Sequence, residues 1–169
     1  MVRRSISAAL ALALAAGCSS TGSQGDEGGT LLSLPATEVL RVQVVDHGEW
    51  GDTAFELEFS REGEPSVKAV RLKGKWSESA RTFKVRTRSV PVRGRVTPAE
   101  LYDLDQALRY YRSGPDATCN DTRFITLTRL RKGQAIDTER LVDESCGEGL
   151  DVRTSFSDLV ARLQVPPAR

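Results

Sequence analysis

Few side chains in this sequence are of the types that catalysis needs. His47 is the only histidine, so any Ser–His–Asp or Cys–His site, in which a base must reach the nucleophile, would have to use it. It lies in the turn-rich segment DHGEWGD at residues 46–52, where a polar side chain needs no special role. No phosphate-binding loop, dinucleotide fingerprint or GxSxG elbow occurs. We therefore expect a non-enzymatic protein with no cofactor and no metal.

Carboxylates gather late in the chain, and their chemistry leaves two alternatives open. Two carboxyls held at a fixed separation across a cleft would suit a carboxylate-dependent hydrolase, with Glu144 as a candidate. Oxygen ligands would also suit calcium, although the spacing of an EF-hand is absent. A solvated acidic loop is the simpler interpretation. The acidic residues of this segment are Asp137, Glu139, Asp143, Glu144, Glu148 and Asp151.

Cations alternate along two expected strands, within a segment (residues 61–95) that holds eleven Lys and Arg against three Glu. Because successive side chains of a strand point to opposite faces, pairing of the two strands would place these cations on one face of the sheet. That face would suit an anionic surface, such as lipid headgroups, lipopolysaccharide or an acidic protein. The alternative is a solvated face whose charges prevent aggregation. The cations are Arg71, Lys73, Lys75, Lys84, Arg86 and Arg88.

The first eighteen residues, MVRRSISAALALALAAGC, combine a basic pair with an apolar run from Ile6 to Ala16. As a helix this run would span about 17 Å, well short of the roughly 30 Å hydrocarbon core. It therefore indicates a signal peptide at residues 1–17 and not a lasting transmembrane helix. The segment Ala15-Ala16-Gly17-Cys18 resembles the lipobox of bacterial lipoproteins, with Ala15 where that family prefers Leu.

The resemblance implies cleavage between Gly17 and Cys18, a diacylglyceryl thioether on Cys18, and fatty acylation, typically with palmitate, of the new amino terminus. Two or three acyl chains hold a protein stably on a membrane. The implied location is the cell envelope, with the outer membrane favoured in a diderm host because Ser19, and not Asp, follows the cysteine. Ordinary secretion after a neighbouring small-residue site is the alternative.

Charge and composition limit the partners of the mature chain. The whole sequence has 24 Lys and Arg against 23 Asp and Glu. Loss of Arg3 and Arg4 with the leader would change the formal net charge from +1 to −1. A near-neutral protein is a poor candidate for nucleic-acid binding, which depends on neutralising phosphates.

The remaining cysteines, Cys119 and Cys146, form an even pair once Cys18 is modified. Outside the cytoplasm such a pair favours a disulfide. A metal site or a catalytic thiol is disfavoured, because the sequence has no CxxC motif and no nearby histidine.

Hydrophobic periodicity predicts one domain, at residues 37–165, between a lipidated Gly/Ser-rich tether (18–36) and a short tail (166–169). A capping box at Thr97 to Glu100 predicts a helix from Pro98 to about Tyr111. A second helix is expected from Ser155 or Ser157 until Pro166 stops it. Alternation predicts strands at residues 39–45, 54–60, 67–72, 82–87, 90–96, 123–129 and 135–142.

The order of five strands, helix, two strands and helix indicates an α+β domain. We expect a mainly antiparallel sheet of about seven strands with two helices packed on one face. Trp50 and Trp76 lie near strand ends and are interpreted as core residues, with a sugar-stacking surface as the alternative.

The expected function is therefore that of a membrane-anchored binding or structural module for an anionic envelope component or a protein partner. Two alternatives remain open. One is an envelope hydrolase that uses carboxylates, and the other is a small-ligand carrier or sensor. The last would need a closed apolar cavity between the sheet and the helices.

Overall fold

The computed structural model describes residues 31–49, 51–114 and 119–169. The predicted signal peptide, Cys18, the tether up to Thr30 and Trp50 lie outside these ranges. Within them the chain forms seven strands, two α-helices and one short 3-10 helix, η1. In chain order the elements are η1 (Leu31–Ser33), β1 (Glu38–Gly48), β2 (Gly51–Ser60), β3 (Ser66–Ser77), β4 (Thr82–Arg88), β5 (Val92–Arg95), α1 (Pro98–Ser113), β6 (Thr122–Arg131), β7 (Gln134–Asp143) and α2 (Phe156–Arg162).

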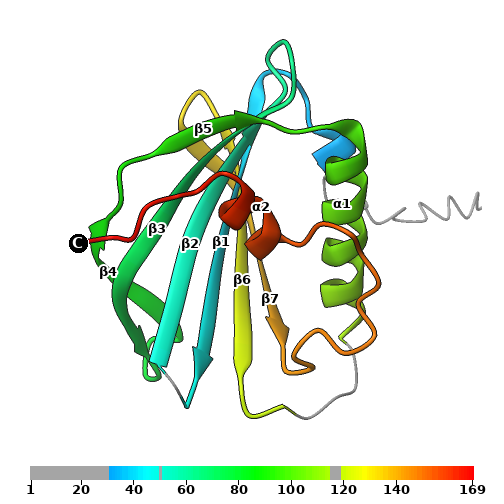
Figure 1. Cartoon of the computed structure of the whole chain (residues 1–169). Helices are drawn as coiled ribbons and strands as arrows, with labels where there is room; N and C mark the ends of the chain where they lie inside the picture. Colours follow the sequence, from blue (N-terminus) through cyan, green and yellow to red (C-terminus); the bar gives the residue numbers. More distant parts are fainter. Residues whose placement is uncertain (1–30, 50, 115–118) are drawn as a thin grey trace, which may run out of the picture.

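All strand pairs are antiparallel, and the sheet has the order β4-β3-β2-β1-β6-β7 with β5 paired to the first part of β3. Both α-helices lie on the same side of this sheet (Figure 1). Each predicted strand overlaps an observed one. The described part of the chain therefore confirms the predicted α+β class.

The main hydrophobic core lies between the sheet and the helices. In β2, Phe55, Leu57 and Phe59 are buried on this side, as the alternation of AFELEFS predicts. Leu104 of α1 belongs to the same core, and Phe59 meets Phe156 of α2 edge-on with ring centroids 6.5 Å apart. Burial of each such side chain contributes about 1.5–3 kcal/mol, so this face supplies most of the hydrophobic stabilisation.

Helix α1 begins at the predicted capping box. Thr97 Oγ1 accepts a hydrogen bond from the Glu100 amide at 3.2 Å, and Glu100 Oε2 accepts one from the Thr97 amide at 2.8 Å. The helix ends at Ser113, where Gly114 adopts the left-handed conformation with φ 60°. Glycine suits that position because it has no Cβ. The predicted helix is confirmed, with an end two residues later than expected.

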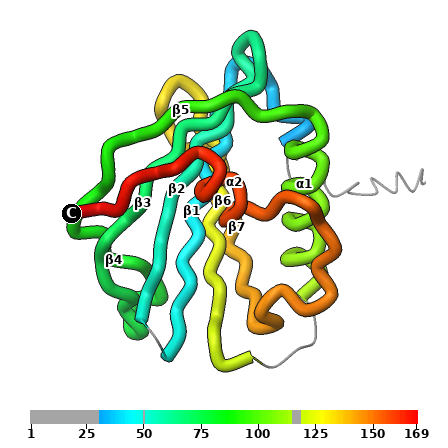
Figure 2. Tube along the Cα trace, viewed as in Figure 1, coloured from blue at the N-terminus to red at the C-terminus, as the bar shows by residue number. Residues whose placement is uncertain are grey.

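Helix α2 is shorter than the sequence predicts. It ends at Arg162, and Gln164 has a φ of 52°, so the chain leaves the helix before Pro166 and the proline is not what stops it. Val165 is buried in the core. The C-terminal segment then crosses the sheet toward β4 (Figure 2), where Arg71 Nε donates to the Val165 carbonyl oxygen at 2.9 Å.

The domain begins earlier than the predicted boundary at residue 37. Leu31 and Leu34 are 1% and 3% exposed and belong to the main core. The buried carboxylate of Asp105 in α1 accepts hydrogen bonds from the Leu31 amide at 2.6 Å and the Leu32 amide at 3.0 Å. The segment LLSL is too short to show a period, so its burial was not visible in the sequence.

A second, smaller hydrophobic cluster lies on the helix-free face of the sheet. Its buried members are Val45, Ala54, Val70, Leu72 and Phe83, with Trp76 packed against them. The burial expected for Trp76 is therefore partial, and the residue lies on the face opposite the helices.

Candidate functional site

The β3–β4 hairpin carries the cations that the sequence singled out. Lys75 lies directly opposite Lys84, and Lys73 lies opposite Thr87. These lysines alternate with Leu72, Trp76 and Phe83 of the helix-free cluster, so they point to the other side of the sheet. All three lysines are exposed. We call Lys73, Lys75 and Lys84 the lysine stripe.

The prediction that all six cations share one face is wrong for Arg88. The pairing register shifts between Lys73 and Gly74, and Arg86 has no direct partner on β3. One extra residue in β4 reverses the alternation beyond it. Arg88 therefore lies opposite Leu72, on the helix-free face, where its guanidinium is 2.7 Å from Glu56 Oε1.

Arg71 shares the face of the lysine stripe, but its guanidinium is already used. Its Nε donates to the Val165 carbonyl of the C-terminal segment. Arg86 is exposed at the bulge. The cations that remain available on one face are thus the lysine stripe, with Arg86 at its side.

The lysine stripe has no acidic partner within ion-pair distance among the described residues. Cross-strand neighbours have Cβ atoms about 4.5–5.5 Å apart, and like charges at such positions destabilise a sheet. Lys75 and Lys84 are such a pair. A bound anion between their ammonium groups would remove this repulsion.

Three cations of the helix-free face, Arg41, Lys68 and Arg88, have acidic partners instead. Glu58 contacts both Lys68 and Arg41, the latter at 2.8 Å from Nη2 to Oε1. Burial raises the pKa of Glu58, but the hydrogen bonds from Lys68 and Arg41 outweigh it, so this pKa is lowered. Glu56 pairs with Arg88 in the same way. The lysine stripe makes no ion pair among the described residues, although the charge of Lys75 acts on Asp52.

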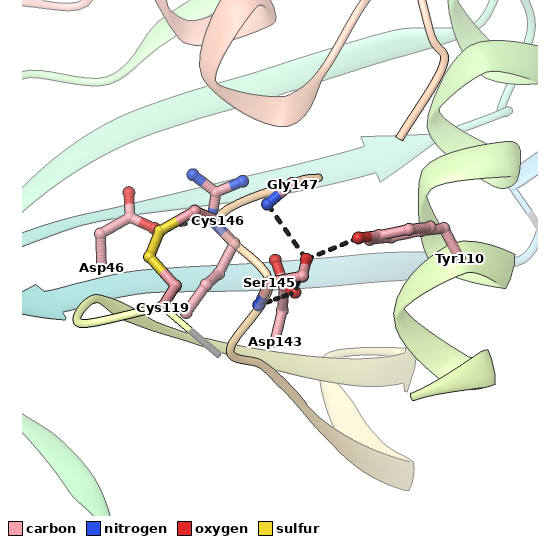
Figure 3. The surroundings of a disulfide bond; sticks show 8 residues. Asp46, Tyr110, Cys119, Asp143, Ser145, Cys146 and Gly147 are labelled. Carbon is pink, nitrogen blue, oxygen red and sulfur yellow. Dashed lines mark hydrogen bonds and ion pairs between the residues drawn. A yellow bond between two sulfur atoms is a disulfide. The ribbon is translucent and has the colours of Figure 1, made fainter. Parts of the chain in front are cut away.

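The predicted cysteine pair joins two loops next to α1. Cys119 and Cys146 form a disulfide with Cα atoms 5.8 Å apart, which confirms the predicted pairing. Figure 3 shows Ser145 between Asp143 and Tyr110. The Ser145 amide donates to Asp143 Oδ1 at 3.0 Å, and its hydroxyl lies 2.5 Å from the Tyr110 hydroxyl. The loop after β7 is therefore fixed to α1 by hydrogen bonds and to the segment before β6 by the disulfide.

A half-buried ion pair lies beside this disulfide. Arg123 Nε donates to Asp46 Oδ1 at 2.6 Å, and Arg123 Nη1 donates to the Tyr111 hydroxyl at 3.1 Å. Burial raises the pKa of Tyr111 above its usual value. For Arg123, burial acts to lower the pKa, but the hydrogen bond and charge of Asp46 outweigh it. These contacts hold β1, β6 and α1 together.

The late acidic residues do not form a cleft with two free carboxyls. Glu139 makes a two-pronged ion pair with Arg112 at 2.9 and 2.7 Å. Asp143 is buried and accepts the hydrogen bonds of Ser145, while Glu144 and Glu148 are exposed. Across the described ranges, no group of three acidic, histidine or cysteine side chains is placed to hold a metal ion.

His47 is engaged by carboxylates at the strand ends. Its Nδ1 is 2.6 Å from Asp52 Oδ1 and its Nε2 is 3.1 Å from Glu78 Oε1. Burial raises the pKa of Asp52, but hydrogen bonds from His47 and from the Trp76 amide, together with the charges of His47 and Lys75, leave it lowered. In the part of the chain that the structure describes, neither ring nitrogen of His47 hydrogen-bonds a serine, threonine or cysteine.

No helix in the described ranges combines the length and the apolar character that crossing a bilayer requires. Comparisons of the chain with models of protein families, with curated proteins and with solved structures find no match.

Proposed function

We propose that this chain is a lipid-anchored protein of a bacterial envelope whose domain binds phosphate-bearing headgroups of envelope lipids through the lysine stripe. The observation that carries the proposal is the pair Lys75 and Lys84, directly opposite each other with Lys73 beside them and without an ion pair among the described residues. On the same strands, Lys68 and Arg88 are paired with Glu58 and Glu56.

The expected strength follows from the number of charges. Each Lys or Arg near an anionic membrane surface contributes about 1 kcal/mol, so three lysines would contribute about 3 kcal/mol. That corresponds to roughly a hundredfold in affinity, since 1.4 kcal/mol is tenfold. Screening shortens the range of these charges to about 8 Å at 0.15 M salt, so binding should weaken as salt is added.

Binding to the headgroups is tested on a protein without the lipid anchor at Cys18, because that anchor would by itself hold the protein on vesicles. A chain from Ser19 to Arg169 retains every residue of the described fold. We expect it to sediment with vesicles of phosphatidylglycerol and not with vesicles of phosphatidylcholine. Lipopolysaccharide aggregates form a second arm, which separates the two sources of phosphate.

The variant that tests the stripe is Lys73→Gln/Lys75→Gln/Lys84→Gln. We expect it to lose roughly a hundredfold in vesicle affinity. The matched control is Arg109→Gln/Lys132→Gln/Arg153→Gln, which removes the same charge from three exposed positions outside the hairpin. Equal losses in the two triple variants would show that only net charge matters and would contradict the proposal. Binding to an acidic protein but not to either lipid would also overturn it.

The anchor has its own test. We expect mass spectrometry of the protein from its native envelope to find a first residue at Cys18 that carries a diacylglyceryl group. An unmodified Cys18, or an intact leader, would refute the anchor. The stripe experiment does not depend on that result.

A further inference from the structure

The helix-free face of the sheet contains a pocket of about 300 Å³, and it does not involve the lysine stripe. Its aromatic wall is formed by Trp76 and Phe124, whose rings stack with centroids 3.9 Å apart and planes 15° apart. Phe83 and Val142 also line it. Val142 is 48% exposed.

The pocket exists because the sheet curls toward this face. Trp76 belongs to β3 and Phe124 to β6, and β2 and β1 lie between these strands. Neighbouring strands are about 4.8 Å apart, so β3 and β6 would be roughly 14 Å apart in a flat sheet. Contact between the two rings therefore requires the β3–β4 hairpin to fold toward β6, which encloses the pocket between the hairpin and β7.

The wall of the pocket contains a polar group with no partner. The indole nitrogen of Trp76, Nε1, is buried and makes no hydrogen bond among the described residues. Buried donors in proteins almost always have an acceptor. An acceptor on a ligand that occupies the pocket would satisfy this one.

The rim of the pocket is positively charged. Arg81, in the turn before β4, and Arg140 of β7 both line it and are both exposed. Neither guanidinium is within ion-pair distance of an acid among the described residues, unlike Arg88 and Arg41 on the same face. Arginine is well suited to bind carboxylates, because its planar group can donate two parallel hydrogen bonds.

We propose that this pocket binds a small amphiphilic carboxylate, with its apolar body against Trp76 and Phe124 and its carboxylate at Arg81 and Arg140. The volume is at the lower end of the range for small-molecule sites, about 300–1,000 Å³. It fits a single short acyl chain or aromatic body better than a two-chain lipid. The small-ligand alternative raised by the sequence thus gains a site, although it lies on the face opposite the helices and is open to solvent.

The probe is decanoate. Decanol and decyltrimethylammonium, which have the same chain length, are the neutral and cationic comparison compounds. Binding is followed by the NMR resonance of the Trp76 indole N–H in the Ser19–Arg169 chain, assigned with a Trp50→Phe variant. We expect decanoate to shift this resonance saturably and to bind at least tenfold more tightly than decanol. Decyltrimethylammonium should leave it unshifted at the same concentrations.

The variant Arg81→Gln/Arg140→Gln should raise the dissociation constant for decanoate by tenfold or more and leave that for decanol unchanged. Arg109→Gln/Arg153→Gln serves as the matched control, and Lys73→Gln/Lys75→Gln/Lys84→Gln should bind decanoate normally. If the double variant unfolds, Val142→Glu tests the same point from an exposed position, because it places a negative charge at the rim.

Equal affinity for decanoate and decanol would overturn the proposal, as would shifts confined to residues outside the pocket. Failure to saturate up to the solubility of decanoate would do the same. Loss of vesicle binding in the lysine-stripe variant would leave this result untouched, so the two proposals can fail separately.

Discussion

On the helix-covered face of the sheet, β2 contributes Phe55, Leu57 and Phe59 to a continuous core, whereas on the other face the same strand carries Ala54 and residues paired to cations. The first face is stabilised by apolar burial. The second combines a small aromatic cluster, ion pairs and an open pocket. Apolar packing under the helices therefore maintains the fold, whereas the helix-free face is only partly packed and keeps an open pocket.

The largest difference between the faces should appear when one phenylalanine is removed from each. Phe59→Ala, in the main core, should lower the free energy of unfolding by about 4 kcal/mol, because it removes buried surface and leaves a cavity. Phe83→Ala should cost about 2 kcal/mol, because the pocket already leaves part of that ring without packing partners. Chemical denaturation measures both. Equal losses would refute the distinction between the two faces.

A smaller effect should come from the ion pairs of the helix-free face. The pKa of Glu58 in the folded chain is below its ordinary value of 4.5. Its ionised form therefore stabilises the fold at pH values above 4.5, and this contribution is lost as the pH falls through the folded pKa. Glu58→Gln should cost about 1 kcal/mol at pH 7, the upper end for partly exposed pairs.

The check is the pH dependence of that cost. Stability-against-pH curves of the wild-type chain and of Glu58→Gln should converge as the pH falls through the folded pKa of Glu58, where the carboxylate becomes protonated in the folded state as well. A constant difference from pH 7 to pH 3 would show that the loss comes from packing and not from charge.

The smallest expected effect is a gain in stability at the lysine stripe. Lys84→Glu replaces a repulsive cross-strand pair with an attractive one to Lys75, so it should raise the free energy of unfolding by about 0.5 kcal/mol. The gain should disappear at 1 M salt, where the screening length falls to about 3 Å. The same variant should bind anionic vesicles less well. If the variant is more stable but binds vesicles less well, the lysines serve binding and not stability.

The elements of the fold were largely predictable because they depend on local patterns. Alternation in AFELEFS and TFKVRTR predicted β2 and β4, and the capping box at Thr97 to Glu100 predicted the start of α1. Short strands and capped helices are determined by residues close together in the sequence. The disulfide was predicted from the number of cysteines and the expected compartment, a route that needs no geometry.

The site was less predictable because it depends on how separate strands meet. A bulge at Arg86 is defined only by the register of β4 against β3, so the alternation of cations hid the reversal at Arg88. The stack of Trp76 on Phe124 joins residues 48 positions apart, and no local pattern signals it. An arginine without an acidic neighbour is likewise visible only when the neighbours are known.

By itself, the sequence determined which segments become strands and helices, and it predicts a leader followed by a cysteine suited to lipid attachment. Tertiary structure alone decided where the domain begins at Leu31, that Arg88 leaves the face of the lysines, and that a pocket opens between the β3–β4 hairpin and β7. The physical reason is the distance along the sequence between the residues that interact. Backbone patterns are set by neighbours within a few residues, whereas charge compensation and cavities are set by side chains that only the curled sheet brings together.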